Sequence, residues 1–232
     1  MNPLMIALDV SSKNRALELA DILRDVAGGF KIGSRLFTAE GPSIVDALVA
    51  RGDKIFLDLK FHDIPNTVAA AVTAASDLGV WMLTVHTQGG IDMMRAAKEA
   101  ALSGSATPLV VGITVLTSLD HDALQTIGVS RQIPDQVTRL ASLAQKAEID
   151  GVVASPREVK AIRETCGSDF KIVTPGIRNG LETTLLGHDD QVRTASATDA
   201  VQDGADYIVV GRPIIEAPDP LEAAQRISAE LA

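Results

Sequence analysis

The sequence predicts a single α/β domain that folds as a closed (β/α)8 barrel, also called a TIM barrel. Eight short apolar runs occur along the chain, and they are almost continuously apolar, which is typical of parallel strands buried on both faces. The segments between them carry apolar residues three and four positions apart, which predicts amphipathic helices. The length of 232 residues suits one barrel of this kind. An open, doubly wound parallel sheet is the alternative that these patterns leave.

The eight predicted strands are separated by Ala- and Leu-rich segments such as 15–28 and 70–79, each of which ends in glycine, as helices often do. Two connections are longer than the others, at 117–133 and 176–197. The second is polar and contains glycine, so it could fold over a ligand as a lid, or it could be a surface excursion without function. In order, the strands are expected at 3–10, 29–33, 53–60, 79–86, 107–116, 149–155, 170–176 and 206–212.

Charge and cysteine content narrow the class of function. With 21 basic and 30 acidic residues the net charge is −9, and no basic run occurs, which argues against a nucleic-acid partner. A small phosphorylated substrate stays possible, because a few local cations act within a Debye length of roughly 8 Å. Cys166 is the single cysteine, no apolar run approaches the roughly 20 residues of a membrane span, and no basic leader precedes the first strand. We therefore expect a cytoplasmic protein without a membrane partner.

Polar residues recur where the predicted strands end. Active sites of (β/α)8 barrels lie at the carboxyl ends of the strands, so these residues should converge on one site. Singly, each has a structural explanation: Asp9 could cap a helix beginning near Ser11, Thr117 could be a cap, and His86 could be a hydrogen-bonded structural residue. Their shared location favours a functional site, and the group comprises Asp9, Lys31, Asp58, Lys60, His86, Thr117, Pro175 to Arg178, Gly211 and Arg212.

The segment FLDLKFHDIPNT (56–67) concentrates charge within an apolar strand. Asp58 and Lys60 are two apart, so the strand period places both side chains on one face. Asp63 follows the strand, and Asn66 or Thr67 could cap the next helix. Two carboxylates favour the charged form of the ammonium between them, so we expect Lys60 to act as an acid and not as a Schiff-base nucleophile.

A divalent metal ion is a competing interpretation of the same cluster, since carboxylates and a nearby histidine can hold Mg²⁺. The fixed cation of Lys60 occupies the place where such an ion would neutralise the acids, so a site without metal is expected. A buried ion-pair network without catalytic duty is the structural alternative.

A phosphate site is predicted at the other side of the barrel. In YIVVGRPI, Gly211 allows close approach of the backbone to a ligand, Arg212 supplies charge, and Pro213 suits the first turn of a short helix. Phosphate often binds after strands seven and eight of such barrels. Arg178 of TPGIR belongs to the same corner, and Gln191 could reach it from the long connection.

These motifs together resemble the orotidine 5′-phosphate decarboxylase family. The resemblance extends over essentially the whole chain, because ALDV, FKIG, FLDLKFHDIPNT, VHTQGG, VLTS, TPGIR, DDQVR and VVGRP occur in the family's order. It implies a homodimeric barrel enzyme, free of cofactor and metal, that removes CO₂ from orotidylate to give UMP in pyrimidine synthesis.

The resemblance also implies a role for each site residue. Lys60 would deliver a proton to C6 of the pyrimidine, with Asp58 beside it. Asp63, Ile64 and Thr67 would reach into the neighbouring subunit's site, while His62 is expected to have no role. The remaining contacts would be Asp9 and Lys31 to the ribose, with Lys31 linked to Asp58; Thr117 and Pro175 to the pyrimidine; Gly211, Arg212 and Gln191 to the phosphate; and Arg178 and His86 as further substrate-binding residues.

Two other functions stay open on the sequence. Barrel decarboxylases and aldol-type enzymes that act on sugar phosphates share an acid-x-lysine-x-x-acid pattern and use Mg²⁺. A barrel that binds a nucleotide as a sensor or that serves as a structural subunit is the non-enzymatic alternative, against which the intact set of Asp58, Lys60 and Asp63 counts.

Overall fold

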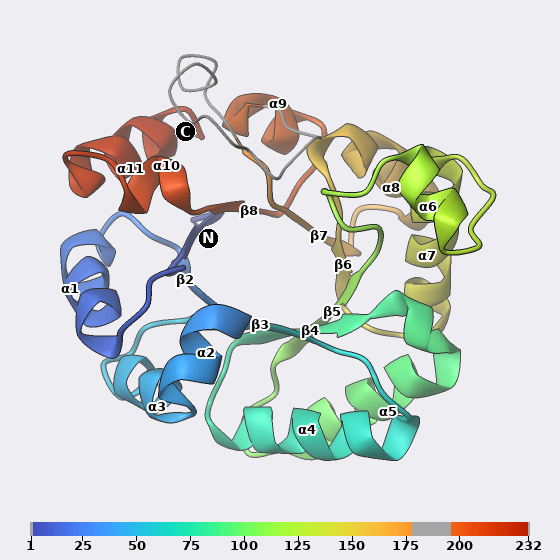
Figure 1. Ribbon diagram of the computed structural model, residues 1–232, viewed down its shortest axis with the longest axis horizontal. Coiled ribbons are helices and arrows are strands. Elements are labelled where there is room, and N and C mark those ends of the chain that lie inside the picture. The colour runs from blue at the N-terminus through green and yellow to red at the C-terminus, as the bar shows by residue number, and fades with distance from the viewer. Residues whose placement is uncertain (1, 178–195, 232) are drawn as a thin grey trace.

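Eight parallel strands close into a barrel that is surrounded by helices in the computed structural model, which describes residues 2–177 and 196–231. Each strand pairs with its neighbours in chain order, and β1 pairs with β8 to close the sheet (Figure 1). The predicted (β/α)8 barrel is confirmed, and the open doubly wound sheet is excluded. The strands are β1 (Leu4–Ala7), β2 (Gly29–Gly33), β3 (Ile55–Phe61), β4 (Met82–His86), β5 (Leu109–Ile113), β6 (Gly151–Val153), β7 (Lys171–Thr174) and β8 (Tyr207–Val210).

Helices fill the connections and form the outer ring seen in Figure 1. The predicted long connection at 117–133 contains a short helix, α6, before α7 begins. The described helices are α1 (Lys13–Leu23), α2 (Ser34–Glu40), α3 (Ser43–Val49), α4 (Pro65–Asp77), α5 (Gly90–Ser103), α6 (His121–Thr126), α7 (Ile133–Lys146), α8 (Val159–Cys166), α9 (Ala197–Gln202), α10 (Arg212–Ile215) and α11 (Pro220–Ala229), with 3₁₀ turns η1 (Thr87–Gly89) and η2 (Pro156–Glu158).

The starts of helices α1 and α4 follow from local sequence, and both differ from the caps that were predicted. The hydroxyl of Ser12 accepts a hydrogen bond from the backbone of Arg15 and caps α1, so Asp9 is left for the site. Helix α4 begins at Pro65, whose fixed φ suits the first turn, and Ile64 takes the cap position without a side-chain bond. The prediction that Asn66 or Thr67 caps this helix is therefore wrong, because both residues lie inside its first turn.

The hydrophobic core has two layers. Side chains that point into the barrel form a small inner cluster, and its members are Met5, Ala7, Phe56, Met82, Val111, Val173, Tyr207 and Val209. The alternate strand residues point outward and pack against the helices in a much larger cluster. This division follows from the two-residue period of strands, and it leaves the carboxyl end of the barrel interior available for polar side chains.

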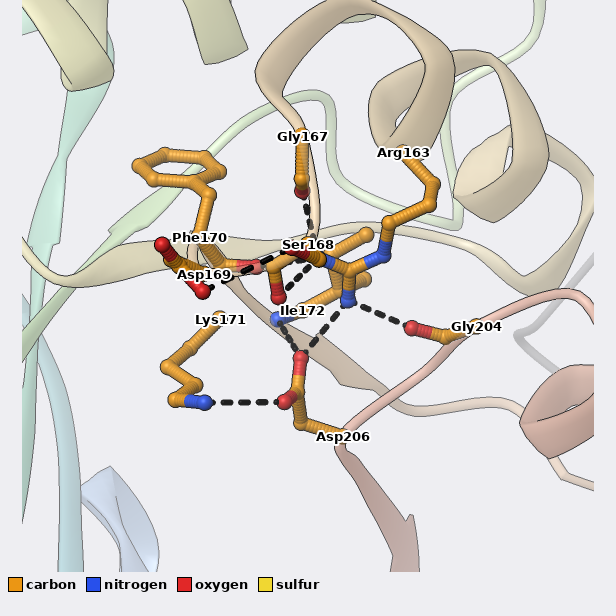
Figure 2. A network of polar contacts seen from close by, with 9 residues as sticks. All are labelled: Arg163, Gly167, Ser168, Asp169, Phe170, Lys171, Ile172, Gly204 and Asp206. Carbon is orange, nitrogen blue, oxygen red and sulfur yellow. Dashed lines mark hydrogen bonds and ion pairs between the residues drawn. The ribbon is translucent and has the colours of Figure 1, made fainter.

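The amino end of the barrel carries a charged network around Asp206, which directly precedes β8 (Figure 2). One carboxylate oxygen accepts from Nη2 of Arg163 at 2.8 Å and from the backbone N–H of Ile172 at 2.9 Å, and the other accepts from Nζ of Lys171 at 3.1 Å. The guanidinium of Arg163 also donates to four backbone carbonyls, those of Gly167, Ser168, Phe170 and Gly204. This network joins α8 to the starts of β7 and β8.

A similar arrangement precedes β6. The carboxylate of Asp150 accepts from Nζ of Lys98 at 2.6 and 2.8 Å and from the backbone N–H of Val110 at 2.8 Å. Asp150 and Asp206 therefore act alike. Each directly precedes its strand, accepts from a backbone N–H of the neighbouring strand, and binds a cationic side chain from a helix.

Within residues 2–177 and 196–231, no helix is long and apolar enough to cross a membrane.

Candidate active site

A cavity of about 420 Å³ opens at the carboxyl end of the barrel. Ala7, Phe56 and Val209 of the inner core form part of its lining, so the apolar barrel interior closes the cavity from below. Charged side chains stand around this apolar base, and those among the described lining residues are Asp9, Lys31, Arg35, Asp58, Lys60, Arg212 and Glu216. The arrangement suits a ligand with an apolar or aromatic part and several charged or hydroxyl groups.

Four of these residues form a chain of alternating charge. Asp9 Oδ1 lies 3.2 Å from Lys31 Nζ, Lys31 Nζ lies 3.7 Å from Asp58 Oδ2, and Asp58 Oδ2 lies 2.8 Å from Lys60 Nζ. The side chains of Lys31 and Asp58 are largely buried, whereas the side chain of Lys60 is 37% exposed and lines the cavity. Lys60 is thus held at one end while its ammonium stays accessible to a ligand.

Glycine provides the space for this chain. A Cβ atom at Gly33 would lie 3.0 Å from Lys31 Nζ and 3.3 Å from Asp9 Oδ1. Both separations are tighter than ordinary van der Waals contact, so any side chain at this position would press on the ion pair. The last residue of β2 was not among the predicted site residues, although the GFKIG motif contains it.

The backbone at Lys60 departs from a regular strand. Leu57 pairs with Leu83 and Phe61 with Val85, so four steps along β3 stand opposite two along β4. Within this bulge Lys60 has φ +54, a left-handed conformation that costs a non-glycine residue on the order of 1–3 kcal/mol. Asp58 and Lys60 do share a face, as the strand period predicts, but the bulge sets the direction of the Lys60 side chain.

Thr84 in the middle of β4 contacts two residues of this bulge, Asp58 and Lys60. Its hydroxyl accepts a hydrogen bond from the backbone N–H of Lys60 at 2.8 Å and donates one to Asp58 Oδ1 at 3.0 Å. The side chain is fully buried behind Asp58. Thr84 was not among the predicted site residues, although one signal was present: it is a hydroxyl residue inside the apolar run MLTVH.

Most of the predicted site residues that the structure describes do converge on the cavity. Those that line it are Asp9, Lys31, Asp58, Lys60, Thr117, Pro175, Gly211 and Arg212. Asp63, Ile64, Thr67 and His86 do not line it. Arg178 and Gln191, with most of the predicted lid at 176–197, lie outside the described residues. Arg35 of α2 and Glu216 after α10 line the cavity and were not predicted.

The corner between β8 and β1 is compact. Gly211 precedes α10, in which Pro213 lies in the first turn as expected. A Cβ at Gly211 would lie 3.4 Å from Cβ of Ala7 and 3.7 Å from Oδ2 of Asp9, which are ordinary van der Waals contacts, so the fold itself does not require glycine here. The backbone here is accessible to a ligand, and Arg212 stands beside it.

His86 lies at the end of β4 and stacks on His62, with ring centroids 5.2 Å apart and an angle of 21° between the rings. Burial is the main cause that lowers the pKa of His86 to about 4, and its electrostatic interactions with His62 and Lys60 contribute to the same shift. His86 is therefore neutral at physiological pH. His62, for which no role was expected, has at least this structural contact.

The described carboxylates of the site that lie next to lysine are paired with ammonium groups. Among the residues that the structure describes, no three His, Cys, Asp or Glu side chains are grouped so that they could hold one. The carboxylate oxygen of Asp58 that faces the cavity already contacts two ammonium groups. Lysine supplies the positive charge that a divalent ion would bring to such acids.

Comparison with known proteins identifies the family. The model of the Orotidine 5'-phosphate decarboxylase / HUMPS family matches residues 2–227. The chain belongs to this family. It is 48% identical over 229 residues to the orotidine 5'-phosphate decarboxylase of Saccharophagus degradans, covering 99% of this chain and 94% of that protein. With the enzyme of the same name from Dichelobacter nodosus the identity is 50%, and 99% of both chains is covered.

Solved structures of this family agree with the fold. The crystal structure of orotidine 5'-phosphate decarboxylase from Lactobacillus acidophilus has a TM-score of 0.86 and 36% identity, with 99% of each chain covered. That of the Pyrococcus horikoshii enzyme has a TM-score of 0.78 and 31% identity, with 98% of each chain covered. The resemblance found in the sequence motifs is thereby confirmed at the level of the family.

Proposed function

We infer that the protein removes the carboxyl group of orotidine 5′-phosphate as CO₂ and releases UMP, the decarboxylation that belongs to pyrimidine synthesis. The observation that carries this inference is the chain Asp9–Lys31–Asp58–Lys60 at the cavity, in a protein that belongs to the decarboxylase family over residues 2–227. The reaction leaves negative charge on a ring carbon, and the site presents an ammonium to meet it.

Lys60 is the proposed proton donor. Loss of CO₂ from C6 of the pyrimidine breaks a carbon–carbon bond and leaves its electron pair on C6, where electrostatic stabilisation and protonation are both required. The ammonium of Lys60 supplies both, since it is positively charged and its side chain is 37% exposed. The proton passes from Nζ to C6, and the product is UMP.

Asp58 has two proposed functions. Its Oδ2 lies 2.8 Å from Lys60 Nζ and so orients the ammonium. The same carboxylate would lie near the substrate carboxylate, and the repulsion between them would be relieved as CO₂ leaves. Asp9 and Lys31, next along the charge chain, would bind the ribose hydroxyls.

The other cavity residues divide the remaining parts of the substrate. Thr117 and the backbone around Pro175 would contact the pyrimidine, and the Gly211 amide and Arg212 would hold the phosphate. Gln191 on the predicted closing segment at 176–197 would complete the phosphate site, and Arg178 is a further candidate contact. Phosphate bound far from the reacting carbon can supply binding energy for closure of the site.

We propose that the active enzyme is a homodimer in which Asp63, Ile64 and Thr67 complete the partner's site. Ile64 supports this proposal, because its side chain is 66% exposed and apolar, and the three residues stand outside the cavity of their own chain. His86, stacked on His62 beside this segment, would then contribute indirectly.

We expect no nucleic-acid or membrane partner, no cofactor, and a cytoplasmic location, with which the single buried thiol of Cys166 agrees.

The decisive experiment follows orotidine 5′-phosphate consumption by ultraviolet absorbance with the wild type and Lys60→Ala. Loss of both the proton donor and its charge should lower kcat/KM by at least about 10³-fold. Lys160→Ala, at an exposed position of α8, is the matched control and should keep wild-type activity. Equal rates for wild type and Lys60→Ala would refute the proton-donor role.

The same assay distinguishes the proposed decarboxylase from a Mg²⁺-dependent enzyme that acts on sugar phosphates. Turnover of orotidine 5′-phosphate should survive EDTA unchanged, because the described site holds its charge with lysine. Activity on a keto-sugar phosphate that requires Mg²⁺, without turnover of orotidine 5′-phosphate, would favour that alternative.

A further inference from the structure

The hydroxyl of Thr84 forms hydrogen bonds with both central residues of the site. One hydroxyl can donate one hydrogen bond, and this one donates to Asp58 Oδ1 at 3.0 Å. It also accepts from the backbone N–H of Lys60 at 2.8 Å. Thr84 has no exposed surface and does not line the cavity, so it cannot itself contact substrate.

The bond to Asp58 fixes the orientation of the carboxylate. Oδ1 faces Thr84, and Oδ2 on the opposite side faces Nζ of Lys31 and of Lys60. Without the Thr84 bond the carboxylate could rotate about its Cβ–Cγ axis and change its distances to both ammonium groups. Rotation of this torsion meets only a low barrier, so an external contact is needed to hold it.

The bond to Lys60 fixes the backbone of the bulge. Between Leu57 and Phe61 the pairing with β4 is interrupted, and the N–H of Lys60 turns to the threonine hydroxyl. The left-handed φ of +54 is unfavourable for lysine and persists only where the surroundings impose it. Relaxation of this residue to an extended conformation would redirect its side chain away from the present position of Nζ.

We propose that Thr84 is a positioning residue for the decarboxylation: through one hydroxyl it holds the Asp58 carboxylate and the left-handed backbone of Lys60 in the arrangement that the reaction uses. The proposal rests on the roles assigned above to Asp58 and Lys60. Threonine suits the position because its branched Cβ favours a strand and its methyl group fills buried space, while its hydroxyl serves the two polar partners.

Thr84→Val tests this proposal, since valine has nearly the same shape and lacks the hydroxyl. We expect kcat to fall by on the order of 10- to 100-fold, because a charged acceptor and a backbone donor lose their shared partner. KM should change by less than about 3-fold, as Thr84 does not contact substrate. Thr84→Ser should restore kcat to within about 5-fold of the wild type, because it returns the hydroxyl.

Thr87→Val is the matched control. Thr87 is also buried, and its hydroxyl donates to the carbonyl of Ile113 at 2.6 Å, away from Asp58 and Lys60. It should lose stability in chemical denaturation and keep kcat within about 3-fold of the wild type. If Thr84→Val does not fold, Thr84→Ala replaces it as the variant without a hydroxyl. Its kcat should then be lower than that of Thr84→Ser by the same factor.

Three results would overturn the proposal: wild-type kcat in Thr84→Val, a serine variant as slow as the valine variant, or equal losses of kcat in Thr84→Val and Thr87→Val. The assay of Lys60→Ala distinguishes failure of the Thr84 proposal from failure of the proposed function. An inactive Lys60→Ala together with a fully active Thr84→Val removes the positioning role alone, whereas an active Lys60→Ala removes the role on which it rests.

Discussion

The two ends of the barrel carry charge networks of similar composition and opposite character. At the amino end, the Asp206 carboxylate accepts from one backbone amide, and the Arg163 guanidinium donates to four backbone carbonyls (Figure 2). At the carboxyl end, Lys60 keeps one described partner, Asp58, for an ammonium that can donate three hydrogen bonds. The first network is formed with groups of the folded chain itself, and the second has donors left for a ligand.

This difference separates stability from function. A charge that is satisfied by fixed backbone groups contributes to the folded state and has nothing to offer a substrate. Lys60 has a left-handed backbone and an ammonium with unused donors, and both features lower the stability of the free protein. Binding of a ligand to the ammonium would offset this cost. The ends should therefore respond differently to substitution, one in unfolding free energy and the other in turnover.

The largest effect is expected for Asp58→Asn. The amide keeps the shape of the side chain and removes the charge that orients Lys60, so kcat should fall by roughly 10³-fold or more. The free energy of unfolding should change by less than about 2 kcal/mol, because the amide fills the same space and its oxygen can still accept the hydrogen bond from Thr84. Turnover and urea denaturation measure the two quantities; a variant that turns over normally but unfolds easily would reverse the assignment of the two ends.

Arg163→Met tests the amino end. Removing the guanidinium leaves four carbonyls and part of the Asp206 carboxylate without this donor, and stability should fall by about 2–4 kcal/mol. The matched control is Lys171→Met, which removes the more exposed, single contact to Asp206 and should cost less than about 1 kcal/mol. At a temperature where the variants are folded, kcat should equal that of the wild type. A large loss of kcat in folded Arg163→Met would show that the two ends are coupled.

Arg212→Ala should have a smaller effect, confined to substrate binding. Loss of a charge-assisted contact to phosphate should raise KM by roughly 10- to 50-fold and leave stability nearly unchanged. Arg35→Ala serves as comparison, because Arg35 also lines the cavity and donates to the backbone carbonyl of Asp9. A greater rise in KM for Arg35→Ala would place the phosphate on the β2 side of the cavity.

The smallest expected effect is the pH dependence due to His86. Its pKa is about 4 in the folded protein against 6.5 as a free side chain, so below pH 6.5 the unfolded chain binds a proton that the folded protein does not. Stability is then full above pH 6.5 and falls as the pH is lowered towards 4. Between pH 7 and 5 this loss should be at most roughly 2 kcal/mol, at about 1.36 kcal/mol for each pH unit over which one proton is bound.

His86→Gln should abolish this part of the pH dependence in denaturation curves recorded at pH 7 and pH 5. His62→Gln should weaken it, because the stacked ring of His62 is one of the groups that lower the pKa of His86. An unchanged slope in His86→Gln would assign the acid sensitivity to other groups.

Much of the architecture could be predicted because it depends on local pattern. Continuous apolar runs separated by helical segments specify a parallel barrel, and all eight strands occur within or overlapping their predicted ranges. The strands are mostly shorter than predicted, and residues are lost from both ends of several ranges. The capping of α4 was missed because Pro65 at the first turn moved the helix start ahead of Asn66 and Thr67.

The sequence by itself determined which residues meet at the cavity: strand order and the two-residue period bring Asp9, Lys31, Asp58 and Lys60 to one end of the barrel, and motif order indicates the family. Only the tertiary structure decided how they are held. Gly33, Thr84 and the bulge in β3 act through contacts between strands, and a hydroxyl in an apolar run gives no sign of its partners until β3 and β4 lie side by side. The physical reason is that periodicity fixes the face on which a side chain lies, whereas the orientation of that side chain depends on neighbours distant in the chain.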